Sequence, residues 1–284
     1  MRVNRINSHV RFLKYFFLVL YFHGAQLTAQ ILTDEAQLYT NLSYRQGTDD
    51  AYTLDRCVLD IYLPGTTDFA TVVWFHGGGL TSGNKFIPEG LKNQGIAVVA
   101  VNYRLYPKVK SPRYIDDAAA AVAWVFKNIA SYGGNPNLIF VAGHSAGGYL
   151  TSMLGLDKSY LNSYDIDSDA IAGLIPYSGH TITHFTVRSE RELKWDDVRV
   201  DHMAPLAHIR KDSSPIILIT GDRELELYGR YEENAYFWRM LQIIGHPYVE
   251  LYELEGYNHG DMAVPAHHIL LKTISNISEK ITSK

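Results

Sequence analysis

The stretch VAGHSAGGYL, residues 141–150, places three glycines around a single serine, Ser145. Glycine weakens a strand or helix by roughly 0.5–1 kcal/mol relative to alanine, so this clustering needs a structural reason. An apolar run typical of a strand, at 137–143, precedes the serine, and a helix-forming run, at 146–156, follows it directly. The pattern G-x-S-x-G in this context predicts a nucleophile elbow, a sharp strand-to-helix turn that exposes the serine hydroxyl. Glycine is expected beside such a turn because larger side chains would collide with neighbouring elements.

Runs of the same two kinds alternate along the rest of the chain. Further strands are predicted at 57–64, 70–79, 95–105, 170–179, 214–222 and 248–256. Helices are predicted at 114–134, 231–246 and 266–278, with a short one at 88–95. Strands that alternate with helices at this spacing predict an α/β fold, in which a mostly parallel central sheet carries helices on both faces.

The amino terminus has the pattern of a signal peptide. Four basic residues precede or border a short apolar core at 15–22, and AQLTAQ at 25–30 offers a cleavage point after Ala29. The apolar run is too short for a stable membrane span. We expect a signal peptide over 1–29, export to the periplasm or the exterior, and a single domain over 30–284. An uncleaved amino-terminal anchor is the alternative.

Composition narrows the class of protein. The 284 residues are 46% hydrophobic and 20% charged, as in one ordinary globular domain. The net charge of −4 gives no electrostatic argument for nucleic-acid binding. The 20 tyrosines suit either a sugar- or aryl-binding surface or simple sheet packing, and the lone Cys57 excludes an internal disulfide. The polar stretch 179–213 is longer than an ordinary connection and is expected to be a lid, an insertion or a surface excursion.

A second glycine cluster, HGGG at 76–79, follows the predicted strand 70–79. The backbone amides of Gly77 and Gly78 are open enough to bind an oxyanion, and removal of one such donor typically costs about 3–4 kcal/mol of transition-state stabilisation. A flexible turn is the alternative interpretation. Together with the serine elbow, the cluster favours an oxyanion hole, to which the N–H of Ala146 would contribute at the start of its helix.

A general base and an acid are expected downstream of the serine. His259, in GYNHGD after the last predicted strand, is the candidate base among the 12 histidines. The order Ser, Asp/Glu, His places the acid in GDRELE at 221–226. Glu224 is narrowly favoured over Asp222, and Glu226 is a third possibility.

Taken together, WFHGGG, VNYRL, the block from Asp116 to Leu150 and NHG resemble the α/β-hydrolase superfamily from about residue 50 to 280. The nearest resemblance is to the carboxylesterases around hormone-sensitive lipase and to bacterial feruloyl and acetyl carbohydrate esterases. It implies that Ser145 is the nucleophile, His259 the general base, and that no metal or organic cofactor is needed. The resemblance also assigns the oxyanion donors, Gly77, Gly78 and Ala146. Such enzymes more often carry aspartate as the acid, so GDRELE departs from the pattern.

The expected activity is ester hydrolysis through an acyl-enzyme. The expected substrate is a small-molecule or oligosaccharide ester from which acetyl or feruloyl groups are removed. One alternative is an amidase resembling kynurenine formamidase, which export disfavours. The other is a non-catalytic binding protein on a hydrolase scaffold, which would be expected to lack the serine or the histidine.

Overall fold

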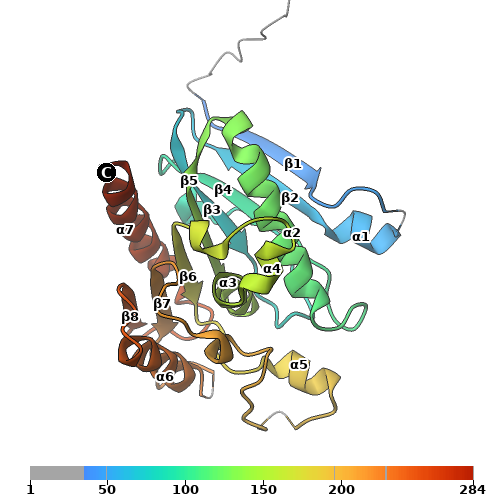
Figure 1. Cartoon of the computed structure of the whole chain (residues 1–284), viewed down its shortest axis with the longest axis vertical. Helices are drawn as coiled ribbons and strands as arrows, with labels where there is room; N and C mark the ends of the chain where they lie inside the picture. The colour runs from blue at the N-terminus through green and yellow to red at the C-terminus, as the bar shows by residue number, and fades with distance from the viewer. Residues whose placement is uncertain (1–34, 49, 195, 228, 284) are drawn as a thin grey trace, which may run out of the picture. The chain divides into compact units, whose positions relative to one another are not determined.

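The computed structural model describes residues 35–48, 50–194, 196–227 and 229–283 (Figure 1). The expected signal peptide, with its cleavage after Ala29, and the alternative of an anchor lie outside the described residues. Within the described ranges, no helix combines the length and the apolar character that crossing a membrane requires.

One eight-stranded sheet forms the centre of this part of the chain. Its strands are β1 (Gln37–Ser43), β2 (Val58–Leu63), β3 (Phe69–Phe75), β4 (Ala97–Val101), β5 (Gly134–His144), β6 (Gly173–Tyr177), β7 (Ile216–Gly221) and β8 (Val249–Leu254). The α-helices are α1 (Ala51–Arg56), α2 (Arg113–Asn128), α3 (Ala146–Leu156), α4 (Lys158–Asn162), α5 (Phe185–Glu190), α6 (Arg230–Ile243) and α7 (Ala263–Thr282). Short 3₁₀ turns are η1 (Glu89–Leu91), η2 (Ile129–Tyr132), η3 (Ser168–Ala170) and η4 (Pro205–His208).

The strand order is β1-β2-β4-β3-β5-β6-β7-β8. β2 runs antiparallel to both of its neighbours, β1 and β4, and every pair from β4 to β8 is parallel. All residues of β3 and β4 are buried, as expected for parallel strands covered on both faces. The predicted α/β fold with a mostly parallel sheet is confirmed.

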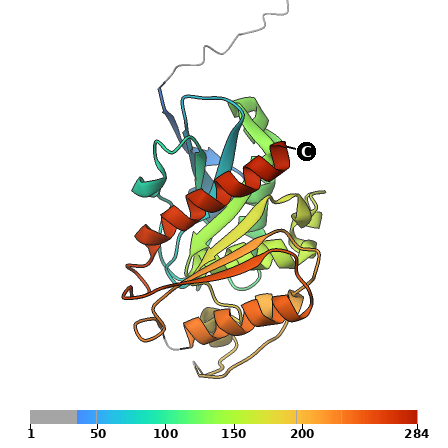
Figure 2. The same cartoon turned by 90° about the vertical axis from the view of Figure 1, so that its left-hand side faces the viewer.

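Helices cover both faces of the sheet, and the side chains of β3 alternate between the two. Val73 and Phe75 pack in a core with residues of α2, α3 and α6. Val72 and Trp74 pack in a second core with residues of α7. Figure 2 shows α7, in red, crossing its face of the sheet.

The structure differs from the sequence-based expectation in several short elements. The helix expected at 88–95 is a single 3₁₀ turn, because Asn93 and Gly95 adopt φ values of 58° and 71° that a right-handed helix excludes. The edge strand β1 was not anticipated. Its residues are mostly exposed or half-buried, so it lacks an apolar run.

The segment 179–213 contains α5 and η4 and is tied to the rest of the fold. The hydroxyl of Thr186 donates to the carbonyl of Gly79. The carboxylate of Glu190 accepts from the backbone N and the hydroxyl of Ser111, at 2.9 and 2.8 Å. His184, in the same segment, is only 1% exposed. These bonds attach the segment beside the HGGG loop.

The glycines after Ser145 allow α3 to lie against the ends of two strands. A Cβ on Gly147 would lie 2.0 Å from the carbonyl oxygen of Phe75, at the end of β3. A Cβ on Gly148 would lie 2.9 Å from the Cα of Gly179. Both obstacles are backbone atoms, so neither position accepts a side chain without displacement of α3.

Gly147→Ala should therefore lower the free energy of unfolding by about 1–3 kcal/mol, the usual cost of forcing atoms into a packed interior. Urea unfolding of the two proteins measures the difference. Gly260→Ala is a matched control, because its Cβ would meet only Asn258 Oδ1, at 3.6 Å. Equal stability of Gly147→Ala and the control would contradict this account of the packing.

Candidate active site

The candidate residues converge because they follow parallel strands. HGGG follows β3, Ser145 follows β5, the stretch 221–226 follows β7 and His259 follows β8. The carboxyl ends of parallel strands meet at one edge of the sheet, where α/β proteins bind ligands.

Ser145 occupies a strained turn between β5 and α3. Its φ of 58° and ψ of −112° are uncommon for a residue with a side chain. The N–H of Ser145 donates to the carbonyl of Tyr177 at 2.8 Å, and its own carbonyl accepts from Tyr149 N at 3.0 Å. These bonds to β6 and to α3 hold the turn, as surrounding structure must wherever backbone strain persists.

The structure brings Ser145 and His259 together. Nε2 of His259 lies 2.9 Å from Oγ of Ser145, and Nδ1 lies 2.8 Å from Oε2 of Glu226. A carboxylate only accepts hydrogen bonds, so Nδ1 donates to Glu226 and Nε2 accepts from the serine hydroxyl. Nε2 of His144, the residue before the serine, lies 2.7 Å from the carbonyl oxygen of His259 and donates to it.

The acid beside His259 is Glu226, and the preference for Glu224 over Asp222 is wrong in this geometry. Within the described ranges, neither Glu224 nor Asp222 makes a hydrogen bond or ion pair with His259. Glu224 is exposed, whereas the side chain of Glu226 is 1% exposed.

Asp222 instead organises the turn that carries the acid. Its Oδ1 accepts from the N–H of Glu224 at 2.9 Å, and its Oδ2 accepts from the N–H of Gly256 at 2.7 Å. The N–H of Glu226 donates to the carbonyl of Asp222, which closes one helical turn. The four-residue step from Asp222 to Glu226 is the sequence signal for this turn.

The carboxylate of Glu226 is fully hydrogen-bonded. Oε1 accepts from Ser178 Oγ at 2.5 Å and from Gly221 N at 3.0 Å, and Oε2 accepts from His259 and from Leu227 N. Burial by itself raises the pKa of Glu226, but the hydrogen bonds from His259 and then Ser178 outweigh it and lower the pKa to about 2. The group is therefore an anion at neutral pH, as the partner of a base must be.

The HGGG loop borders the serine. A Cβ on Gly77 would lie 3.4 Å from Cβ of Ser145 and 3.2 Å from the carbonyl oxygen of His144. Gly78 adopts φ of 108°, and its carbonyl accepts from the N–H groups of Thr81 and Ser82. Ala146 is the first residue of α3, where N–H groups lack an acceptor within the helix. Gly77 and Ala146 thus flank Ser145 with backbone amides.

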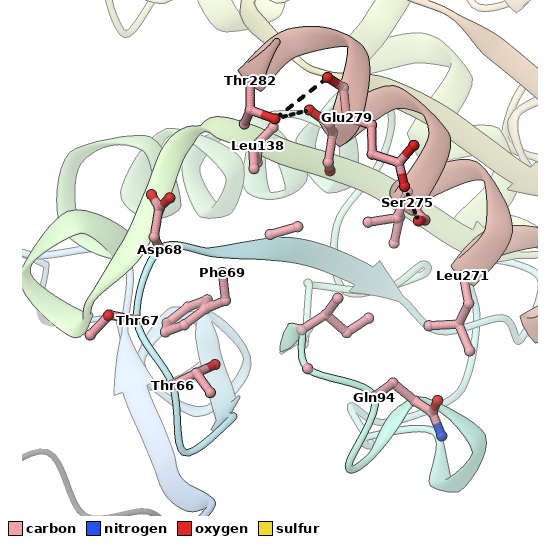
Figure 3. A pocket seen from close by; sticks show the side chains of 15 residues that line it. Thr66, Thr67, Asp68, Phe69, Gln94, Leu138, Leu271, Ser275, Glu279 and Thr282 are labelled. Carbon is pink, nitrogen blue, oxygen red and sulfur yellow. Dashed lines mark hydrogen bonds between the residues drawn. The ribbon is translucent and has the colours of Figure 1, made fainter.

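A separate pocket of about 450 Å³ lies at the opposite edge of the sheet (Figure 3). It is lined by Phe69 at the start of β3, by Ile96 before β4 and by Glu279 of α7, among others. Because β3 and β4 begin there, this pocket is remote from the serine, at their carboxyl ends. Among the described residues, no group of three or more His, Cys, Asp or Glu side chains could hold a metal ion.

Comparisons with known proteins find esterases among the proteins similar to this chain. Residues 59–178 match the family model described as BD-FAE. The chain is 26% identical over 224 residues to Esterase LipC of Mycobacterium tuberculosis, which covers 70% of this chain and 52% of that protein. It is 42% identical over 89 residues to Carboxylesterase NlhH of the same species, which covers 29% of this chain and 28% of that protein. The chain thus spans about half the length of LipC.

Solved structures share the fold. A truncated form of a carbohydrate esterase from gut microbiota superposes with a TM-score of 0.72 at 19% identity, covering 85% of this chain and 96% of that one. Esterase 2 of Thermogutta terrifontis, phosphorylated by paraoxon, superposes with a TM-score of 0.66 at 23% identity, covering 87% and 94%.

Substitution of the buried carboxylate tests the pairing with His259. Glu226→Gln should slow labelling of Ser145 by a fluorophosphonate probe by about 10³–10⁴-fold, as loss of the carboxylate does in serine-histidine-aspartate triads. Glu224→Gln, two residues away and exposed, should label at the rate of the unmodified protein. The reverse ranking of the two variants would contradict the assignment. Labelling is followed by mass spectrometry of the peptide that contains Ser145.

The free energy of unfolding at acid pH tests the lowered pKa of Glu226. The pKa of Glu226 is lowered from 4.5 to about 2 in the folded protein, so its stabilising effect is present above pH 4.5 and is lost as the pH falls towards 2. Urea unfolding should therefore show a steeper loss of stability across this interval for the unmodified protein than for Glu226→Gln. Parallel curves would refute the lowered pKa.

Proposed function

We propose that this chain is a serine esterase of the α/β-hydrolase superfamily that removes acetyl or feruloyl groups from carbohydrate esters. The observation that carries the proposal is the continuous hydrogen-bond chain from Ser145 through His259 to Glu226. A buried carboxylate, an imidazole and a half-buried serine in a strained turn are the parts that acyl transfer requires.

Acylation begins at the serine. Ser145 Oγ attacks the ester carbonyl carbon while His259 Nε2 takes the hydroxyl proton, and Glu226 stabilises the imidazolium that forms. The carbonyl oxygen becomes an oxyanion, which the N–H groups of Gly77, Gly78 and Ala146 bind. Collapse of this intermediate breaks the bond to the alcohol oxygen, which takes the proton from His259.

Deacylation repeats the steps with water. His259 removes a proton from the water as it attacks the acyl carbon, and then returns that proton to Ser145 Oγ as the acid leaves. The side chains of this chain supply each proton transfer in the cycle.

Two observations support a carbohydrate or aryl ester as the substrate. The first is that a structurally similar protein is described as a carbohydrate esterase. Tyr257, two residues before His259, is 43% exposed, and Phe185, whose ring would meet a Cβ on Gly79, is 38% exposed. Aromatic rings at these places suit a sugar ring or an aryl group, which stack by burial of apolar area. The signal peptide expected from the sequence of residues 1–29 would export the protein to where such polysaccharides occur.

Ser145→Ala should lower kcat for 4-nitrophenyl acetate by about 10⁶-fold, because the variant lacks the attacking hydroxyl and keeps only the residual catalysis of substrate binding and the oxyanion hole. Ser163→Ala is the matched control, since the hydroxyl of Ser163 is exposed and donates to the carbonyl of Tyr160. Retained turnover in Ser145→Ala would remove the mechanism. Release of the nitrophenolate is followed by absorbance.

The substrate class is tested on a panel of acetylated xylo-oligosaccharide, feruloylated arabino-oligosaccharide and N-formylaniline. We expect acetate or ferulate release with a kcat/KM at least about tenfold above that for the anilide, a difference of roughly 1.4 kcal/mol in transition-state stabilisation. Preference for the anilide would favour an amidase. Inertness to both oligosaccharides, with nitrophenyl acetate still hydrolysed, would leave an esterase of another substrate class.

A further inference from the structure

A buried hydroxyl, that of Ser178, lies beside His259 and Glu226 and takes no part in the proton transfers described for the reaction. Ser178 is the first residue after β6 and is fully buried. Its Oγ lies 2.5 Å from Oε1 of Glu226 and 3.1 Å from Nδ1 of His259. We propose that Ser178 is a positioning residue of this site, which orients the Glu226 carboxylate and shares the Nδ1 proton of His259. The inference rests on the proposed function.

The direction of each bond follows from the chemistry of the groups. The carboxylate of Glu226 only accepts, so the single hydroxyl proton of Ser178 is donated to Oε1. A lone pair of the same oxygen is then free to face the Nδ1–H of His259. The bond to Oε1 leaves Oε2 directed at the imidazole. One hydroxyl thereby contacts both members of the ion pair that forms during acylation.

The backbone sets the position of this hydroxyl. Ser178 adopts φ of 46°, which is uncommon for a residue with a side chain. Its N–H donates to the carbonyl of Ile219 at 2.7 Å, and its carbonyl accepts from Nη1 of Arg230. Arg230 is 2% exposed and pairs through Nε with Oε1 of Glu233 at 2.9 Å. Bonds from β7 and from α6 therefore hold a conformation that the residue itself disfavours.

The effect on the reaction is expected in the step that charges His259. Oε1 keeps only the N–H of Gly221 as a donor when the hydroxyl is removed. The hydrogen bond from Ser178 is one of the contacts that lower the pKa of Glu226, so its loss raises that pKa. The freed carboxylate also gains rotational freedom, which spoils its alignment with Nδ1. Among the described residues, the hydrogen bonds of Ser178 go to Glu226, His259, Ile219 and Arg230 and not to the HGGG loop, so we expect KM to change little.

The test uses Ser178→Ala and Ser178→Gly in the full chain, with 4-nitrophenyl acetate as the probe. Both variants should lower kcat by about 10- to 100-fold with KM within twofold, as expected for one lost hydrogen bond to a charged group. The acidic limb of the profile of kcat against pH should also move to higher pH, because loss of the Ser178 hydrogen bond raises the pKa of Glu226. Glycine accepts a φ of 46°, so Ser178→Gly adds no backbone strain and should lose only the stability that one buried hydrogen bond contributes. A purely structural serine would lower activity only in proportion to the unfolded fraction, which urea unfolding measures.

A double-mutant cycle with Glu226→Gln tests the route of the effect. If Ser178 acts through the carboxylate, Ser178→Gly should cost less than about twofold in the Glu226→Gln background. Equal costs in both backgrounds would overturn the proposal. Ser214→Ala is the control for the loss of a buried hydroxyl, since Ser214 is 5% exposed and lies before the start of β7. It should keep full kcat.

The same assay separates failure of this inference from failure of the proposed function. An unmodified protein that hydrolyses no ester and takes no fluorophosphonate at Ser145, or a Ser145→Ala variant that keeps its turnover, overturns both. A different result overturns only the role of Ser178: the unmodified protein hydrolyses the ester, Ser145→Ala does not, and Ser178→Gly keeps the kcat and the pH profile of the unmodified protein.

Discussion

The contact between the start of α3 and the carbonyl end of β3 is the constraint on which the site depends. Gly147 lies against the Phe75 carbonyl with no space for a Cβ, and this closeness directs the chain through the left-handed turn at Ser145. The same contact brings the HGGG loop, which continues β3, beside the serine. A larger residue at this point would separate the hydroxyl from the glycine amides, so the strand-to-helix angle decides whether the catalytic parts meet.

A polar network extends from this turn into the interior. It runs from His144 through the backbone and ring of His259 to Glu226, then to Ser178, Arg230 and Glu233. Buried charges are costly unless they are paired and hydrogen-bonded. Here the carboxylate of Glu226 has four donors, and the guanidinium of Arg230 has the Glu233 carboxylate and the Ser178 carbonyl. Such a network restricts each group to one orientation, which is what proton transfer between fixed atoms requires.

The segment between β6 and β7 links these two features. Through Thr186 it bonds to the carbonyl of Gly79 in the HGGG loop, and through Glu190 it bonds to Ser111 and Tyr114 near the start of α2. Phe185 places an exposed ring over the same glycine. Phe185 and Thr186, which lie against the HGGG loop, are thus more than a hundred positions away from it in the sequence. The surroundings of the loop therefore depend on packing between distant parts of the chain.

The sequence by itself determined the α/β fold, the elbow at Ser145 and the pairing with His259, because these follow from local signals: hydrophobic runs, glycine spacing and chain order. It did not determine which of Asp222, Glu224 and Glu226 faces His259. All three lie within one short turn. The choice depends on the hydrogen bond that Gly256 N–H donates to Asp222 and on those that Gly221 and Ser178 donate to Glu226. Those partners come from β6, β7 and the loop after β8, which only the folded sheet brings together. Local pattern records which residue types a segment contains, whereas the direction of a carboxylate is set by hydrogen bonds from neighbours distant in sequence.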